Sequence, residues 1–348
     1  MVSLGNLQST CNKPNICILE IVSILKQSSL KTNTMAPSSP TSLSTLHKPR
    51  ILCLHGGGVN ADIFRTQMRS FISALSPYFR LIFADGPFLC NPGPGMIPVY
   101  KDYGPYRRWL RWLPEHPAVD DEAAVEELEY NMRSAMNSDE GDGEWVGLLG
   151  FSQGAKLAAS VLYESQLRAG KVVKEGLDGM YGGVDDTEEV VEGLAGGKWR
   201  FAVCMAGRAP LVSFSELSHG SKTMVTAGQT SEGINFADMF AAFGENKNKL
   251  SLPTVHVHGT KDAGLHLHRV LLDSYCAPGS TTLVEWEGEH RIPLKSIDVN
   301  KVVEAILKVA KVNNSCFYVC AMLILAIPDI WGSRREGNEW TRLKNLET

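Results

Sequence analysis

Short apolar runs alternate with amphipathic stretches from about residue 50 onward. Six runs are rich in Val, Ile, Leu and Phe and end in Gly, Pro or polar residues, as buried strands do. The stretches between them space their apolar residues three or four apart, which is typical of helices that bury one face. The predicted strands are 50–56, 79–87, 145–152, 201–207, 253–260 and 281–288, and the predicted helices are 61–76, 121–136, 154–167, 264–276 and 296–311.

This alternation predicts an α/β fold with a mainly parallel sheet of about six strands and helices on both faces. The chain has 348 residues, of which 44% are hydrophobic and 21% charged, and this composition suits a globular protein with a sizeable core. No internal repeat is visible. We expect one folded domain over residues 49–311.

The two ends of the chain differ in composition from this domain. Residues 1–48 close on a stretch rich in Ser, Thr and Pro, so we expect a flexible leader there. Residues 1–34 are either an upstream extension of the gene model, which would then start at Met35, or a disordered arm. The C-terminal tail, 312–348, contains the run CFYVCAMLILAIPDIW, which is short for a membrane span before Pro328. A docked helix, a weak membrane contact and a misread exon all remain open for it, and stable membrane insertion is not expected.

Two internal segments also interrupt the alternation. Residues 87–117 are dense in Pro, Gly, Tyr and Trp, and a long aromatic loop of this kind favours a lid or a pocket wall. Residues 171–199 are acidic and rich in Gly, and they favour a mobile surface insertion.

Charge and cysteine usage exclude several classes of protein. The net charge is −4 and there is no long run of Lys or Arg, so a nucleic-acid partner is not expected. The eight cysteines form no CxxC pair and no dense framework, which favours a reducing compartment such as the cytoplasm. The N-terminal run ICILEIVSIL is interrupted by Glu20 and is not preceded by a basic region, so we read no secretion signal.

Candidate chemistry begins at the stretch GLLGFSQG, which places Ser152 between Gly150 and Gly154 at a predicted strand-to-helix turn. In a G-x-S-x-G motif the two glycines keep side chains out of a sharp turn, and the serine hydroxyl is presented above the edge of the sheet. A structural turn is the alternative interpretation. The strand and helix on either side favour a nucleophile.

A serine nucleophile requires a base and an orienting acid. In α/β-hydrolases both lie downstream, on loops after later strands, and Asp262 and His290 occupy such positions. Rival carboxylates lie within a helix, on a strand or directly beside His290, and are therefore less well placed. These rivals are Asp273, Glu285, Glu287 and Glu289.

Four further histidines lie close together in the sequence, at positions 256, 258, 266 and 268. A metal site is one interpretation of this group. An i, i+2 pair in an apolar strand is more typical of packed or hydrogen-bonded core positions, and no acidic ligand pattern accompanies it. We therefore expect no metal and no other cofactor.

Two backbone N–H groups are candidates for an oxyanion hole. One belongs to Gln153, which follows the nucleophile at the start of a helix, and the other to the loop His55-Gly56-Gly57-Gly58. We choose Gly57 over Gly58, although the sequence hardly separates them. A phosphate-binding loop is disfavoured because no GxGxxG or GK[ST] spacing is present. His55 precedes the serine in the chain, so it is expected to brace the loop rather than to act as the base.

Taken in order, the stretches ILCLHGGGVNADIF, FADGP, GLLGFSQGAKLAA, HGTKDAGL and GEHRIP resemble the FSH family of serine hydrolases, which has the α/β-hydrolase fold. The resemblance runs from about Pro49 to about Ala310 and includes Asn60, Gln153 and Pro293. It implies a cytosolic esterase or thioesterase without a cofactor. Family members in fungal biosynthetic clusters release polyketide chains from carrier-bound thioesters, so the resemblance also implies an acyl carrier domain as a partner.

The expected activity is hydrolysis of an acyl ester or thioester through an acyl-serine. Aromatic residues between Tyr100 and Trp112 are expected to shape an apolar acyl pocket, with Tyr103, Tyr106 and Trp109 as substrate contacts. Two alternatives are a carboxylesterase for small esters and a binding protein that keeps the fold without turnover. Arg107, Arg108 and Arg111 are expected to form an ordinary solvated basic face rather than to meet an acid product or a phosphopantetheine arm.

Overall fold

The structure is a computed structural model, which describes residues 45–97, 99–178, 193–219, 221–229 and 249–312. Most of the predicted leader, the middle of the acidic insertion and the C-terminal tail from residue 313 lie outside the described residues. Within the described part, no helix is long and apolar enough to cross a membrane.

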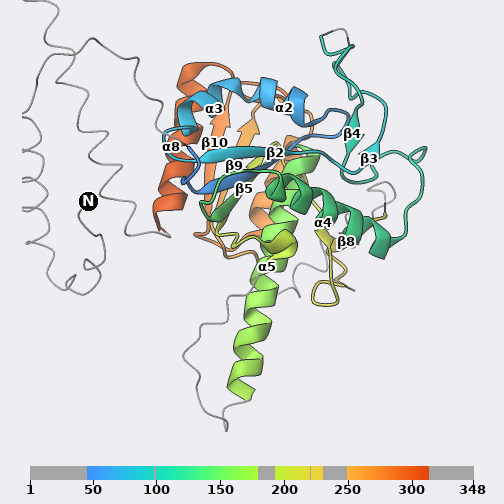
Figure 1. Ribbon diagram of the computed structural model, residues 1–348, viewed down its shortest axis with the longest axis vertical. Helices are drawn as coiled ribbons and strands as arrows, with labels where there is room; N and C mark the ends of the chain where they lie inside the picture. Colours follow the sequence, from blue (N-terminus) through green and yellow to red (C-terminus); the bar gives the residue numbers. More distant parts are fainter. Residues whose placement is uncertain (1–44, 98, 179–192, 220, 230–248, 313–348) are drawn as a thin grey trace, which may run out of the picture. The chain divides into compact units, whose positions relative to one another are not determined.

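A six-stranded parallel sheet forms the centre of the domain, and all six predicted strands are confirmed. Its order is β10-β9-β6-β5-β1-β2. The first strand, β1, lies next to the edge strand β2, and the later strands β5, β6, β9 and β10 follow one another on the other side of β1. Figure 1 shows the sheet in the middle of the domain, between α2 and α3 on one side and α4 and α5 on the other. The six strands are β1 (Arg50–Leu54), β2 (Arg80–Ala84), β5 (Trp145–Phe151), β6 (Phe201–Met205), β9 (Thr254–Gly259) and β10 (Thr281–Trp286).

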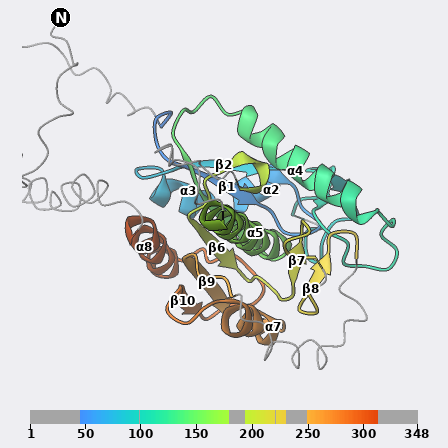
Figure 2. The same ribbon diagram turned by 90° about the horizontal axis from the view of Figure 1, so that it is seen from below.

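Helices cover both faces of this sheet, as the alternation predicts. One face packs against α2 (Ala61–Gln67), α3 (Arg69–Leu75) and α8 (Ser296–Val312). The other packs against α4 (Asp121–Asn137), α5 (Gln153–Asp178) and α7 (Leu265–Val270), as Figure 2 shows. A short π-helical turn, Leu271–Tyr275, continues α7.

The period-two pattern of the strands supplies the two halves of the core. In β1, Ile51 and Cys53 belong to the cluster under α2, α3 and α8, whereas Leu52 and Leu54 belong to the cluster under α4 and α5. All four side chains are fully buried. Because both faces are covered, the strand reads as a continuous apolar run in the sequence.

Several short elements are absent from the sequence-based prediction. The aromatic segment contains an antiparallel pair, β3 (Phe88–Leu89) and β4 (Arg107–Arg108). A second small sheet pairs β7 (Leu211–Ser213) with β8 (Met224–Thr226) in parallel. A 3-10 turn spans Leu194–Gly196.

Two predicted domain boundaries differ from the structure. The domain begins before residue 49, because the Lys48 ammonium donates to the Ser76 carbonyl and the Asp142 N–H donates to the Leu46 carbonyl. The acidic insertion was expected to start at 171, but α5 continues to Asp178. At its other end, Trp199 is buried and its indole N–H donates to the Leu194 carbonyl, so residues 193–199 belong to the folded domain.

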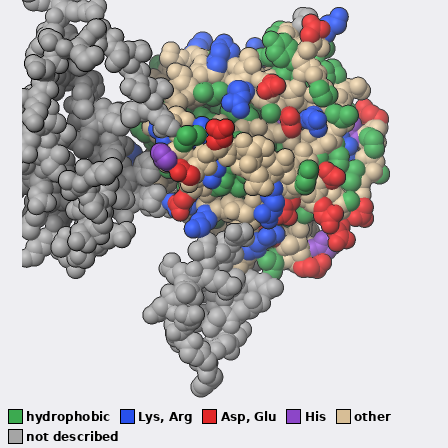
Figure 3. Space-filling view, in the orientation of Figure 1, with side chains coloured by type: hydrophobic (Ala, Val, Ile, Leu, Met, Phe, Trp, Pro, Cys, Tyr) green, Lys and Arg blue, Asp and Glu red, His purple; other side chains and the backbone are tan. Residues whose placement is uncertain are grey.

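Acidic and basic side chains are interspersed over the face of the domain seen in Figure 3. A surface that mixes both signs in this way gives no broad field of one charge toward a polyanion.

Candidate functional site

Ser152 lies at the turn between β5 and α5, with a φ of 53°. This left-handed conformation is strained for a residue with a side chain, and close backbone approach on both sides enforces it. A Cβ on Gly150 would lie 2.2 Å from the Gly154 carbonyl carbon, and one on Gly154 would lie 2.0 Å from the Leu54 carbonyl oxygen. Only glycine fits at either position, and the half-buried serine is turned out of the strand.

His290 and Asp262 meet Ser152 at the carboxyl edge of the sheet, after β10 and β9. His290 Nε2 lies 2.9 Å from Ser152 Oγ, and His290 Nδ1 lies 2.6 Å from Asp262 Oδ2. The carboxylate can only accept, so Nδ1 carries the proton and Nε2 is free to accept from the serine. The three residues that the sequence singled out are thus joined by two hydrogen bonds.

Asp262 is held in its position by its own loop. Its side chain is 1% exposed, and Oδ1 accepts the Gly264 N–H at 2.7 Å. Burial alone would raise the pKa of the Asp262 carboxyl, but the hydrogen bonds from Gly264 and His290 hold that pKa below its ordinary value. The group is therefore an anion at neutral pH.

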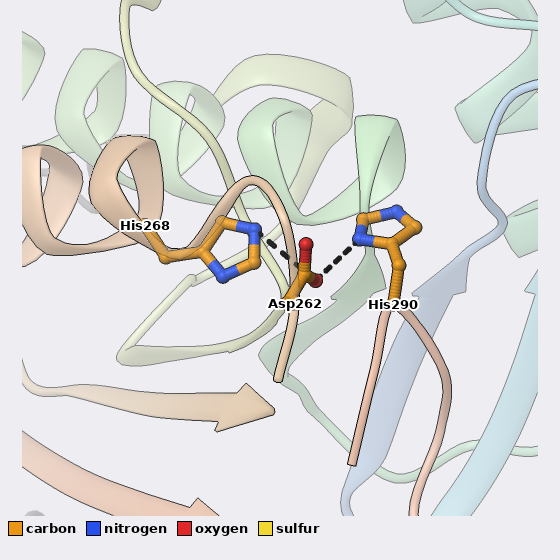
Figure 4. A group of neighbouring side chains, drawn as sticks. All are labelled: Asp262, His268 and His290. Atoms are coloured by element: carbon orange, nitrogen blue, oxygen red, sulfur yellow. Dashed lines mark hydrogen bonds and ion pairs between the residues drawn. The ribbon is translucent and has the colours of Figure 1, made fainter. Parts of the chain in front are cut away.

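A third imidazole, His268 on α7, lies on the other side of the carboxylate (Figure 4). Its Nε2 is 3.6 Å from Asp262 Oδ2, which is too long for a hydrogen bond, and the side chain has no exposed surface. Burial lowers the pKa of His268 to about 3, so the ring is neutral. His268 therefore lies beside Asp262 and His290 without adding a positive charge to them.

Asp262, His268 and His290 each offer one potential metal-ligand atom, and these atoms lie within 4.8 Å of one another. The Asp262 oxygen and His290 Nδ1 are already bonded to each other. A cation at this point would have to break that bond, so the arrangement fits proton transfer better than metal coordination.

The rival carboxylates are engaged elsewhere. Glu285, Glu287 and Glu289 pair with Arg269, Lys261 and Arg291 at the surface. Asp273 is exposed.

The loop after β1 is braced by His55, as expected. His55 Nδ1 donates to the Gly56 carbonyl at 2.7 Å, and its Nε2 accepts the Gly86 N–H at 2.9 Å. Burial lowers the pKa of His55 to about 4, so this neutral tautomer persists at ordinary pH. The Gly58 N–H donates to the Arg107 carbonyl at 2.9 Å and is therefore already used, which separates Gly57 from Gly58.

The side chain of Gln153 links the turn after Ser152 to the aromatic segment. Its Oε1 accepts the N–H groups of Trp109 and Leu110 at 2.7 and 3.2 Å, and its Nε2 donates to the Leu110 carbonyl at 3.0 Å. The sequence assigned only the backbone of this residue a role. Its side chain fixes the aromatic segment beside Ser152.

The expectation for Trp109 is wrong. Its side chain has no exposed surface and packs within the core, and its indole N–H already donates to the His55 carbonyl at 2.9 Å, so Trp109 is a core residue. The Tyr106 hydroxyl donates to the Tyr100 carbonyl, and Tyr103 stays half exposed against the Tyr100 ring. No contact between these tyrosines and Ser152, Asp262 or His290 is found among the described residues, and their contact with substrate stays a prediction.

Trp112, which the sequence did not single out, is the aromatic residue at the glycine loop. A Cβ on Gly57 would lie 2.8 Å from Cζ3 of Trp112, so the indole covers that glycine directly. Trp112 also packs edge-on against the His116 ring, with centroids 4.4 Å apart. Trp109 and Trp112 are equivalent in the sequence, because only the chain path decides which of them reaches the loop.

Comparison with known proteins agrees with this geometry. The model of the serine hydrolase (FSH1) family matches residues 43–302. The esterase pigG of Monascus ruber is 46% identical over 77% of this chain and 93% of its own length. The esterase claE of Penicillium crustosum is 41% identical over 77% of this chain and 95% of its own length. A carboxylesterase structure from Bacillus cereus is 20% identical over 75% of this chain and 89% of that chain, with a TM-score of 0.41, a level too low to bear on function. The family match and the relatives together show that this chain belongs to the FSH1 family of serine hydrolases and is an ester-hydrolysing enzyme.

Proposed function

We propose that Ser152, His290 and Asp262 are the catalytic triad of this esterase. The observation that supports the proposal is the pair of hydrogen bonds running from Ser152 Oγ through the imidazole to a buried carboxylate. A hydroxyl alone is a poor nucleophile at neutral pH, and this relay supplies both the base and the group that orients it.

The reaction then proceeds in two halves. His290 Nε2 takes the proton of Ser152 as Oγ attacks the ester carbonyl, and Asp262 stabilises the imidazolium that forms. The same imidazolium protonates the leaving group, and an acyl-serine remains. Water attacks this intermediate with His290 again as the base, and the acid is released.

The oxyanion of each tetrahedral intermediate is proposed to bind the N–H groups of Gly57 and Gln153. The Gln153 N–H lies at the first position of α5, where helical N–H groups have no intrahelical partner and the helix dipole favours negative charge. Gly57 is favoured over Gly58 because the Gly58 N–H is occupied by Arg107. Two such donors lower the barrier by stabilising charge as it develops.

The substrate is proposed to be an acyl ester or thioester, with release of a polyketide or a related acyl chain in secondary metabolism and with presentation on an acyl carrier domain. The resemblance to FSH enzymes of biosynthetic clusters and the apolar indole of Trp112 over Gly57 support this choice. A cytoplasmic location is proposed as well, because the described cysteines, Cys53, Cys90, Cys204 and Cys276, are free thiols.

The triad is tested by covalent labelling with a fluorophosphonate probe. The wild-type protein is expected to be labelled at Ser152, and Ser152→Ala is expected to lose the label while keeping its melting temperature. A Ser160→Ala variant is the control, since that buried serine donates to the Lys156 carbonyl within α5. Folded wild-type protein that takes up no label would contradict the proposal.

The Gln153 side chain forms three hydrogen bonds to the backbone of Trp109 and Leu110, and this clamp gives a further prediction. Gln153→Met removes the acceptor of two N–H groups and is expected to lower kcat about tenfold or more, because the segment over Gly57 loosens. Gln153→Glu keeps an acceptor for the two N–H groups, but it places a carboxylate oxygen against the Leu110 carbonyl and a negative charge beside the proposed oxyanion donors, so kcat is expected to fall here as well. Steady-state kinetics with a p-nitrophenyl ester compare the two, and equal kcat values for both variants and the wild type would count against the clamp.

A further inference from the structure

Arg108 is a buried cation without an ionic partner among the described residues. The sequence favoured a solvated basic face for this arginine, and that expectation is wrong, because its side chain is only 2% exposed. Its Nε and Nη1 atoms are buried and have no hydrogen-bond partner in the described part of the chain. An unpaired buried guanidinium costs free energy that an anionic partner would offset.

Arg111 adds a second positive charge near Arg108, and the Glu115 carboxylate acts on the neighbouring His116 ring in the opposite sense. Arg111, which donates to the Pro114 carbonyl, also has a buried and unpaired Nε. Both arginines lie close enough to His116 to lower the pKa of that buried ring, after the larger effect of burial. Arg108 stacks on the Phe88 ring at 4.6 Å, which supports the cation without neutralising it. Within the described ranges, neither arginine forms an ion pair.

Two series of contacts link this cationic group to the proposed catalytic centre. The His116 ring packs on Trp112, and Trp112 covers Gly57. On the other side, Arg108 immediately precedes Trp109, whose N–H donates to the Gln153 side chain next to Ser152. The group is thus connected to both residues that carry the proposed oxyanion donors.

We propose that Arg108, with Arg111 and His116, forms an anion subsite that binds a charged oxygen group of the ester substrate. This group is a carboxylate on the acyl chain or a phosphate on the leaving group. Arginine is suited to either, because its planar fork of donors matches oxyanion geometry. The proposal rests on the proposed function, since it places the anion on the molecule that Ser152 attacks.

Matched substrates test the subsite. The mono-p-nitrophenyl esters of adipic and suberic acid carry a free carboxylate, and their methyl esters are the neutral counterparts. A second arm compares acyl-phosphopantetheine with acyl-pantetheine. We expect kcat/KM to favour the charged member by about tenfold to hundredfold in one arm, the value of hydrogen bonds to a charged group. The arm that shows the preference identifies the source of the anion.

Substitutions connect this preference to the residues. In Arg108→Met, the kcat/KM of the charged substrate divided by that of its neutral counterpart is expected to fall toward one. A general loss of activity does not change this ratio, because it lowers kcat/KM for both substrates alike. Lys101→Gln removes the same charge from an exposed position of the same segment and is expected to keep the ratio. An unchanged ratio in Arg108→Met, or no preference of the wild type in either arm, overturns the subsite.

The wild-type protein supplies a measurement that does not depend on the folding of a variant. Monomethyl adipate is expected to inhibit hydrolysis of the neutral ester competitively, and dimethyl adipate is expected to do so at least tenfold more weakly. Equal inhibition by the two overturns an acyl-side subsite. Hydrolysis of neutral esters depends on the proposed triad and not on the subsite. If the wild type hydrolyses these esters but shows no preference for a charged substrate, the subsite is wrong and the proposed function stands. If the wild type neither hydrolyses them nor takes up the fluorophosphonate label, the proposed function itself is wrong.

Discussion

An Asp262→Asn variant is expected to fold and to lose about four orders of magnitude in kcat, the size of effect known for the same change in trypsin-like triads. The Gly264 N–H donates to Oδ1, so the amide oxygen of the substituted side chain would take that position and its NH₂ group would face His290. An NH₂ group can only donate, so Nδ1 must become the acceptor and Nε2 must carry the proton. His290 would then have no lone pair with which to accept the proton of Ser152.

Two measurements check this expectation. Steady-state kinetics should show the loss in kcat, and the melting temperature should show that the fold survives. Glu289→Gln is a matched control, because this exposed carboxylate pairs with Arg291 and lies next to His290 in the chain. If Asp262→Asn keeps kcat within tenfold of the wild type, the carboxylate does not fix the imidazole and the assignment of its role is wrong.

The proposed triad could be predicted from the sequence because each of its members follows a strand of one parallel sheet. The carboxyl ends of β5, β9 and β10 lie at the same edge, so Ser152, Asp262 and His290 meet there whatever the details of the loops. The strands themselves were visible as apolar runs, since both faces of the sheet are covered.

The side-chain positions in the segment 87–117 could not be predicted from the sequence, because this segment has no periodic pattern that shows which side chains face the core. Hydrogen bonds made by Gln153 and His55 bury Trp109 and leave Trp112 over Gly57, and neither bond has a signal in the sequence. The same path buries Arg108, although an arginine in a basic stretch is usually solvated. The three-residue strands of the β7–β8 sheet are too short for an alternating pattern to identify them.

Acidification below about pH 6.5 is expected to destabilise the protein steeply. Four histidines are fully or almost fully buried, and burial is the largest cause of a lowered pKa in each of them. The pKa falls to about 4 for His55 and His258, and to about 3 for His256 and His268. In the unfolded chain these rings bind protons near pH 6.5, whereas in the folded protein they stay neutral down to about pH 4. The unfolded state therefore binds more protons in this window, and the free energy of unfolding falls as the pH falls.

The slope of the free energy of unfolding against pH measures how many of these four histidines take part. Each buried histidine contributes about 1.4 kcal/mol per pH unit, so four of them can remove several kcal/mol between pH 6.5 and 5, a large share of the stability of an ordinary domain. Urea unfolding at a series of pH values from 7.5 to 5 gives the slope directly.

His256→Phe is expected to lower this slope by about one proton, because a buried ring that must charge on unfolding is replaced by one that cannot. His256 suits the substitution since it lies in β9, away from Ser152, and its Nδ1 has no hydrogen-bond partner among the described residues. The absolute stability will change as well, because the bond to Thr254 is lost, but the slope is independent of that offset. His266→Gln removes an exposed histidine from α7 and should leave the slope as it is. A free energy of unfolding that stays level from pH 7 to 5, or a slope that His256→Phe does not change, would mean that these rings are already protonated inside the fold and that a partner for their charge lies beside them.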